Sequence, residues 1–163
     1  MKKMMKNRKG FTLMEMLIVV AIIAILVIIA IPTFNSALAK ARAATDVANI
    51  RSGYAAAQVD AMTEGLKGKD GKDATTVTYI LQQDGSVKKN DDTANAKPYK
   101  CVGSSKNAAS GTTIGGRVEV NIEKTDSENG KIGWAKDATI TYTVTETDGV
   151  FSVEIASNGT SGN

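Results

Sequence analysis

An uninterrupted apolar run at residues 16–31 constrains this chain more than any other feature. The run lies within a longer stretch, residues 11–34, whose exceptions are Thr12, Glu15, Pro32 and Thr33. A helix of about 20 apolar residues is long enough to cross the hydrocarbon core of a bilayer. The sequence therefore predicts a membrane-spanning helix close to its N-terminus.

Glu15 is the anomaly in this helix, because it places a carboxylate near the start of the span. An acidic group at the centre of a membrane helix costs roughly 2.5–3.5 kcal/mol, and less near an end. We therefore expect Glu15 to have a partner. The first ten residues include no acid and five basic residues: Lys2, Lys3, Lys6, Arg8 and Lys9. By the positive-inside rule, this end of the helix faces the cytoplasm.

The charge of the chain depends on whether this basic leader is retained. The whole chain has 20 basic and 17 acidic residues, a net charge of +3. Without residues 1–10 it has 15 basic residues against 17 acidic ones, a net charge of −2. A basic isoelectric point is then weak support for nucleic-acid binding, and the sequence gives no firm evidence for a nucleic-acid partner.

The motif Lys9-Gly10-Phe11-Thr12-Leu13-Met14-Glu15, followed by the apolar run and Pro32, resembles the N-terminus of type IV pilins and pseudopilins. The resemblance covers roughly residues 1–65 in detail. It implies that a prepilin peptidase cleaves between Gly10 and Phe11, and that the new amine of Phe11 is methylated. It also implies that Glu15 pairs with the N-terminal ammonium of a neighbouring subunit during assembly.

Two positions depart from the family pattern. Ala24 stands where many members have a glycine upstream of the proline. Cys101 is the one cysteine, so the C-terminal disulfide loop of many Gram-negative relatives cannot form, which fits a source among Gram-positive bacteria. A lone cysteine in an exported chain is a free thiol or an intermolecular link. We expect Cys101 to be a partly buried, inert thiol.

Two simpler interpretations of the N-terminus compete with a prepilin. A secretory signal peptide also has a basic start and an apolar core, and Ala37-Leu38-Ala39 resembles its cleavage site. That core is normally about 7–15 residues long, and this one is longer and includes Glu15. A plain membrane anchor is the other alternative. The combination of Gly10, Phe11 and Glu15 favours the prepilin.

Beyond Pro32 the sequence stays helical and becomes amphipathic. Pro32 removes a backbone donor and clashes with the preceding turn, which predicts a kink. Apolar positions then recur every three or four residues and form one stripe. The stripe consists of Ala43, Val47, Ile50, Tyr54, Ala57 and Ala61.

The charged residues of this half are predicted to lie off the stripe, with Arg42 and Asp46 paired across one turn. Gly53 weakens the helix by about 1 kcal/mol relative to alanine, and Gly65 ends it. The predicted helix covers residues 11–64 and is about 80 Å long at 1.5 Å per residue. A single small domain cannot cover that length, so the first half must contact lipid or other subunits.

After a glycine-spaced polar loop at residues 65–76, the sequence changes to a β pattern. Residues 77–82 are rich in branched and aromatic side chains, and Asp84-Gly85 predicts a hairpin into residues 86–88. A short helix beginning at Asp73 is the alternative, because the apolar residues of this segment also share a helical face.

The middle of the second half is mostly loop. Residues 98–102 are predicted to form a short edge strand and residues 103–116 a loop. Residues 117–123 alternate between apolar and polar side chains, which predicts a strand.

The last third predicts a second hairpin. Residues 139–145 and 150–155 both alternate, and Asp148-Gly149 forms a two-residue turn between them. The turn sets a register in which the apolar faces coincide. In this register Val144 faces Val153 and Tyr142 faces Ile155.

The predicted fold class is α+β and similar to that of a pilin. An antiparallel sheet with one apolar face needs a cover, and the stripe is the amphipathic element available. Trp134 is predicted to seal an edge of that interface. The resulting organisation is a cleaved leader at residues 1–10, an apolar helix at 11–34, an amphipathic helix half at 35–64, and a head of loop and sheet at 65–163.

The composition argues against catalysis. The chain has no histidine, which removes the commonest general base and metal ligand. One cysteine is too few for the usual zinc sites, and the aspartates of the glycine-spaced loop do not have EF-hand spacing. We predict no enzyme activity, no cofactor and no metal site.

The predicted function is a structural subunit that polymerises into a type IV pilus. Its expected partners are copies of itself in a helical filament, a prepilin peptidase, the pilus assembly machinery, and the cytoplasmic membrane before assembly. The filament would then lie outside the cell. A minor pilin or pseudopilin of a secretion or DNA-uptake system is the first alternative. A membrane-anchored domain that never polymerises is the second.

Overall fold

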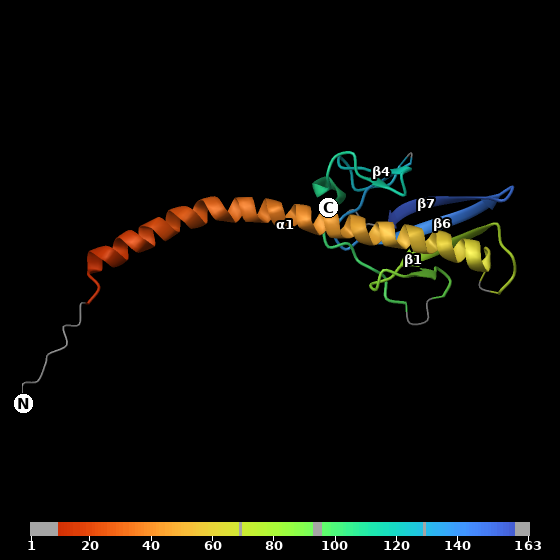
Figure 1. Cartoon of the computed structure of the whole chain (residues 1–163), viewed down its shortest axis with the longest axis horizontal. Helices are drawn as coiled ribbons and strands as arrows, with labels where there is room; N and C mark the ends of the chain where they lie inside the picture. The colour runs from red at the N-terminus through yellow and green to blue at the C-terminus, as the bar shows by residue number, and fades with distance from the viewer. Residues whose placement is uncertain (1–9, 69, 93–95, 129, 159–163) are drawn as a thin grey trace, which may run out of the picture. The chain divides into compact units, whose positions relative to one another are not determined.

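The computed structural model of the chain describes residues 10–68, 70–92, 96–128 and 130–158 (Figure 1). Of the predicted leader, only Gly10 is among the described residues, and residues 1–9 lie outside them. The chain divides into two compact units, residues 1–37 and residues 38–163. Helix α1, Leu13–Glu64, contributes to both.

Helix α1 has nearly the predicted bounds. It begins two residues later than expected, at Leu13, and it ends at Glu64, before Gly65 with its positive φ of 70°. Both Ala24 and Pro32 lie inside the helix, which continues through them without a break. The kink at Pro32 stays a prediction.

The second unit contains a four-stranded antiparallel sheet in the order β2-β1-β6-β7, against which α1 packs (Figure 1). The strands are β1 Thr76–Leu81, β2 Val87–Lys89, β6 Thr139–Thr147 and β7 Val150–Asn158. Strand β1 confirms the strand prediction for residues 77–82 over the short helix.

The predicted hairpin register is confirmed. Val144 pairs with Val153, and Tyr142 pairs with Ile155. Asp148 and Gly149 both have positive φ, 53° and 76°. Such values at both central positions are those of a type I′ turn, whose twist matches that of the flanking strands.

A second, smaller sheet was not predicted. It has the order β3-β4-β5, with β4 and β5 parallel. Its strands are β3 Thr113–Ile114, β4 Val118–Val120 and β5 Lys131–Ile132. The predicted loop at residues 103–116 therefore contains β3, as well as a 3-10 helix, Ser105–Asn107.

Two strand predictions were wrong in extent or in kind. The strand expected at residues 117–123 stops at Val120, because the Asn121 side chain accepts hydrogen bonds from the next backbone N–H groups and turns the chain. The edge strand expected at residues 98–102 does not form. Its backbone donates instead to Leu81, Ala138 and the Asp46 carboxylate.

All six residues of the predicted stripe are buried in the second unit. Gly53 is also buried, and a Cβ at this position would collide with the hydroxyl and ring of Tyr142. The Tyr142 hydroxyl donates a hydrogen bond to the carbonyl of Ile50 at 2.9 Å. Gly53 is therefore the point of close approach between α1 and the sheet.

The prediction for Asp46 was wrong. Its side chain is fully buried rather than paired with Arg42, which is exposed. Oδ1 accepts from the Tyr99 hydroxyl and from Val102 N–H, both at 2.8 Å. Oδ2 accepts from Gly103 N–H at 2.8 Å and from Trp134 Nε1 at 3.0 Å. These bonds satisfy a charge that would otherwise be costly to bury.

The Asp46 contacts also place Trp134 and Cys101. Trp134, which was predicted to seal an edge of the interface, is fully buried, and its Nε1 donates to Asp46. Cys101 is a free thiol and is 1% exposed, more buried than expected. Burial raises the pKa of the Cys101 thiol, and the nearby Asp46 charge adds to this. A buried, protonated thiol is inert.

Candidate functional site

The start of α1 carries a reciprocal pair of hydrogen bonds between Thr12 and Glu15. Glu15 Oε2 accepts from the Thr12 backbone N–H at 2.8 Å and from Thr12 Oγ1 at 2.9 Å. In return, Glu15 N–H donates to Thr12 Oγ1 at 3.2 Å. This is a capping box, which satisfies donors that the first helical turn leaves unpaired.

The capping box gives Glu15 a hydrogen-bond partner within its own chain. From the sequence we expected the partner of Glu15 to come from another subunit, yet its first partner is Thr12 in the same chain. Oε1 has no hydrogen-bond partner among the described residues, and the side chain is exposed. Thr12 therefore orients the Glu15 carboxylate through Oε2, and Oε1 remains available to a cation.

The predicted cleavage site lies just before this cap. Gly10 and Phe11 precede the helix, and both are exposed. A Cβ at Gly10 would meet no atom within 4 Å, so the described chain leaves open space around it. Exposed, non-helical backbone is what a peptidase can bind in extended form.

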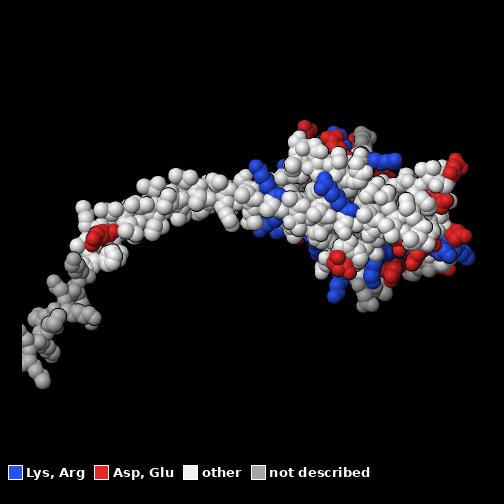
Figure 2. Space-filling view, in the orientation of Figure 1, with Lys and Arg blue, Asp and Glu red and all other residues white. Residues whose placement is uncertain are grey.

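The first unit exposes an apolar surface. Every residue from 10 to 37 is exposed, and large side chains remain 45–86% accessible, including Leu13, Val27 and Ile28. Figure 2 shows this part of α1 without charged side chains beyond the cap, and the sequence has none at residues 16–39. Contiguous apolar surface of this size marks contact with lipid or protein.

Within the described residues, α1 is the helix whose length and composition would allow it to cross a membrane. Its most apolar window has a mean hydropathy of 3.2, and none of that window is buried. A soluble core helix of similar composition would be covered by its own domain. This half of the helix is therefore suited to contact lipid first and the helices of other subunits later.

The acidic side chain of Asp70, in the glycine-spaced loop, is bonded within that loop. Asp70 accepts from the Lys72 N–H at 3.2 Å and pairs with its ammonium at 3.5 Å, which closes the glycine-spaced loop. The described part of the chain contains no group of three or more His, Cys, Asp or Glu residues placed to hold a metal ion.

A protein-family model matches the start of the chain. Residues 5–31 match the family model described as the prokaryotic N-terminal methylation motif. This segment includes Gly10, Phe11, the capping box and most of the apolar helix. No solved structure matches the chain. The chain thus carries the class III signal motif of type IV pilins, which implies processing by a prepilin peptidase and pilus-type assembly.

Proposed function

We propose that this protein is a structural subunit that polymerises into a type IV pilus at the cell surface. The single observation that carries the proposal is the uncovered apolar half of α1, most of which lies within the methylation motif. A permanent anchor would need the apolar surface, but it would not need a cleavable leader or an acid at the first turn. A subunit that leaves the membrane for a filament needs all three.

Glu15 is the residue to which we assign recognition between subunits. Cleavage after Gly10 releases the ammonium group of Phe11, and Oε1 of Glu15 is available to accept it from a neighbour. In a low-dielectric environment, this charge-assisted hydrogen bond is much stronger than in water. Thr12 is a positioning residue, because it holds Oε2 of the same carboxylate.

The driving force for assembly cannot be the hydrophobic effect alone. The apolar half of α1 moves from lipid to a bundle of similar helices, and lipid tails are as apolar as leucine, so the transfer itself gains little. Packing between helices and the Glu15 pair then supply specificity. Head-to-tail contacts that do not close produce an open helical polymer.

We assign the second unit a structural role and no enzymatic one. Its core residues hold the sheet against α1, and its buried acid, Asp46, already accepts four hydrogen bonds within the fold. In the filament, this unit would form the outer surface. The work of extracting each subunit from the membrane would come from a separate assembly machinery.

The test is mass spectrometry of surface filaments sheared from cells that express the chain, combined with electron microscopy. We expect filaments whose main subunit begins with a methylated Phe11. A minor pilin or pseudopilin would give the same N-terminus in a trace component of filaments or in none. Retention of Gly10 in the mature protein would overturn the proposal in favour of a membrane-anchored domain.

A further inference from the structure

A hollow lies beside α1 near the start of the second unit. Its volume is about 610 Å³, and it opens between α1 and the segment that follows the 3-10 helix. From α1 it is lined by Lys40, Ala44, Val47 and Arg51, and from the opposite wall by residues 107–109 and Thr112. We call this hollow the α1 groove. Half of its lining residues are alanine or valine, and none of them is acidic.

Two cations line the α1 groove beside this apolar surface. Arg51 is fixed, because its Nε and Nη2 donate to the Thr113 carbonyl at 3.1 and 2.9 Å. The Lys40 ammonium has no hydrogen bond or ion pair within the described residues. Asp46 is the one acid between them on α1, and its carboxylate already accepts four hydrogen bonds in the core. The groove therefore presents uncompensated positive charge beside apolar side chains.

The tip of the hairpin between β6 and β7 has the opposite charge. We define the tip as residues 146–150, which extend past Thr145, the last residue of β6 that pairs with β1. Glu146 and Asp148 are exposed, and their carboxylates have no hydrogen-bond or ion-pair partner within the described residues. Val150 is 65% exposed. The tip is therefore an acidic knob that also offers an apolar side chain.

The tip is held in place by the fold. Its turn fixes the two strands, and the Glu146 N–H donates to the Thr75 carbonyl at 2.9 Å. Asp73 lines the same small hollow as Glu146 and Asp148. Among the described residues that line this hollow, none is basic. The negative potentials of the three carboxylates therefore add up.

The α1 groove and the tip lie at opposite ends of the second unit (Figure 1). Ala74, beside the tip, donates its N–H to the Leu66 carbonyl, just past the end of α1. Residues 44 and 64 are separated by about 30 Å of helix at 1.5 Å per residue. One copy therefore cannot fill its own groove with its own tip. Figure 2 shows basic side chains where α1 enters this unit and several acidic ones at the opposite end.

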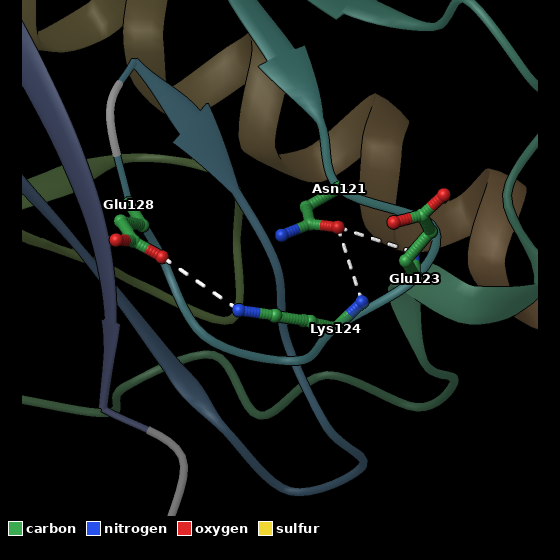
Figure 3. A network of polar contacts seen from close by, with 4 residues as sticks. All are labelled: Asn121, Glu123, Lys124 and Glu128. Carbon is green, nitrogen blue, oxygen red and sulfur yellow. Dashed lines mark hydrogen bonds and ion pairs between the residues drawn. The ribbon is translucent and has the colours of Figure 1, made fainter.

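The loop between β4 and β5 provides a contrast (Figure 3). Lys124 Nζ lies 3.8 Å from Glu128 Oε2, so these two charges offset each other. Asn121 Oδ1 accepts from the N–H groups of Glu123 and Lys124 at 3.1 and 3.0 Å, which fixes the turn that carries this lysine. The carboxylates of the tip have no such cation within the described residues, so their charge remains for a partner.

We propose that the tip of one copy docks into the α1 groove of a second copy. Glu146 and Asp148 then lie against Lys40 and Arg51, and Val150 lies on the apolar lining. The inference rests on the proposed polymerisation and names the surfaces through which second units meet. Because these surfaces lie at opposite ends, the contact is heterologous and does not close, which generates a polar row of copies. The complementary charges select this arrangement over others.

The contact is too small to hold two copies together by itself. A tip of five residues is well below the roughly 20–30 residues a side of a standard interface. We therefore expect no dimer through this contact in detergent. In a filament, packing of the apolar halves of α1 raises the effective concentration of tip and groove. The contact then decides how neighbouring second units are arranged.

A disulfide between copies would locate the contact directly. Ala109→Cys and Val150→Cys in one chain place a thiol in the α1 groove and another on the tip. A disulfide requires the two Cα atoms to approach within about 7 Å. Filaments sheared from cells that express this variant are oxidised mildly and separated on a denaturing gel without reductant. We expect a ladder of dimers, trimers and longer species, because each copy links to the next. Cys101 is 1% exposed and should not react.

Ala109→Cys with Asn90→Cys is the matched control, since Asn90 is exposed and follows β2, far from the tip in the sheet order. This pair, and each single variant, should give no ladder. Filaments of the first pair without a ladder would overturn this inference alone, as would an equal ladder in the control. A parent chain that forms no filaments would refute the proposed function, and this inference with it.

Charge exchange tests the recognition. Lys40→Glu should lower filament yield at least about threefold, because it sets a carboxylate against the acids of the tip. Adding Glu146→Lys or Asp148→Lys to this variant should, in at least one of the two combinations, restore the yield to within about twofold of the parent. Lys97→Glu, at another exposed lysine, should leave the yield unchanged. An unchanged yield in Lys40→Glu, or no recovery in either combination, would overturn the proposal. Trp134 fluorescence in urea checks that each variant folds, and the disulfide pairs decide the matter if one does not.

Discussion

Replacing Asp46 should destabilise the second unit more than any other change of a single polar side chain on α1. The carboxylate is fully buried, and it accepts four hydrogen bonds from the loop at residues 99–103 and from Trp134. Asp46→Ala leaves two backbone and two side-chain donors without their acceptor. The loop and the indole are then no longer tied to the helix.

The magnitude follows from two opposing effects. Four hydrogen bonds to a charged acceptor are worth about 1.5–3 kcal/mol each, an upper limit of roughly 6–12 kcal/mol. Burying the carboxylate offsets several kcal/mol of this. We therefore expect Asp46→Ala to lower the free energy of unfolding by about 3–5 kcal/mol, the usual cost of removing one partner from a buried charged network. Asp46→Asn should cost less, because one oxygen still accepts.

Trp134 makes the measurement specific. It is the one tryptophan of the chain, and its Nε1 donates to Asp46, so its fluorescence reports on the network directly. In urea titrations of the full chain in detergent, 3–5 kcal/mol shifts the midpoint by more than about 1 M. Glu64→Gln, an exposed acid on the same helix, is the control. If the free energies of unfolding of Asp46→Ala and the control differ by less than about 0.5 kcal/mol, the Asp46 hydrogen bonds do not stabilise the unit as proposed.

Three further predictions follow from other contacts. Gly53→Ala should destabilise the second unit by about 1–3 kcal/mol in the same urea titration despite alanine's better helix propensity, because its Cβ collides with Tyr142; no loss would contradict the packing. Burial and the Asp46 carboxylate raise the pKa of Tyr99 to about 12, against about 10 in an unfolded chain. The stabilisation from the protonated Tyr99 hydroxyl is therefore complete below about pH 10 and is lost as the pH rises through about 12. Tyr99→Phe should thus make the free energy of unfolding fall less steeply between these pH values, by up to about 1.4 kcal/mol per pH unit. An unchanged slope would count against this role of Tyr99. Thr12→Val should lower filament yield and Thr12→Ser should restore it, since only serine rebuilds the capping box; equal yields by electron microscopy would remove Thr12 from assembly.

The elements with a strong periodic pattern were predictable from the sequence. The helix bounds, the stripe and the hairpin register all rest on spacings that repeat over many residues, and the Asp148-Gly149 turn allowed one register in which both apolar faces coincide. In the second sheet, such a pattern marked β4, within residues 117–123, but neither of its partners. Strands β3 and β5 are two residues long, and their pairing is decided by tertiary contacts.

Asp46 was misplaced for a physical reason. An aspartate one position before a stripe residue is normally solvated, and nothing local reveals four donors that lie 53 to 88 residues away in the chain. The capping box differs, because Thr12 and Glu15 have the required spacing in the sequence itself. The capping box was therefore predictable from this spacing, unlike the buried place of Asp46.

The central claim is that Glu15 joins subunits, and Glu15→Ala tests it most directly. The variant removes a charge from the span, so membrane insertion should be at least as favourable as in the parent chain. N-terminal mass spectrometry of the membrane fraction, together with electron microscopy of the same cells, separates processing from assembly. We predict a subunit cleaved after Gly10 and retained in the membrane, with few or no filaments. Abundant ordinary filaments built from the Glu15→Ala subunit alone would contradict the account.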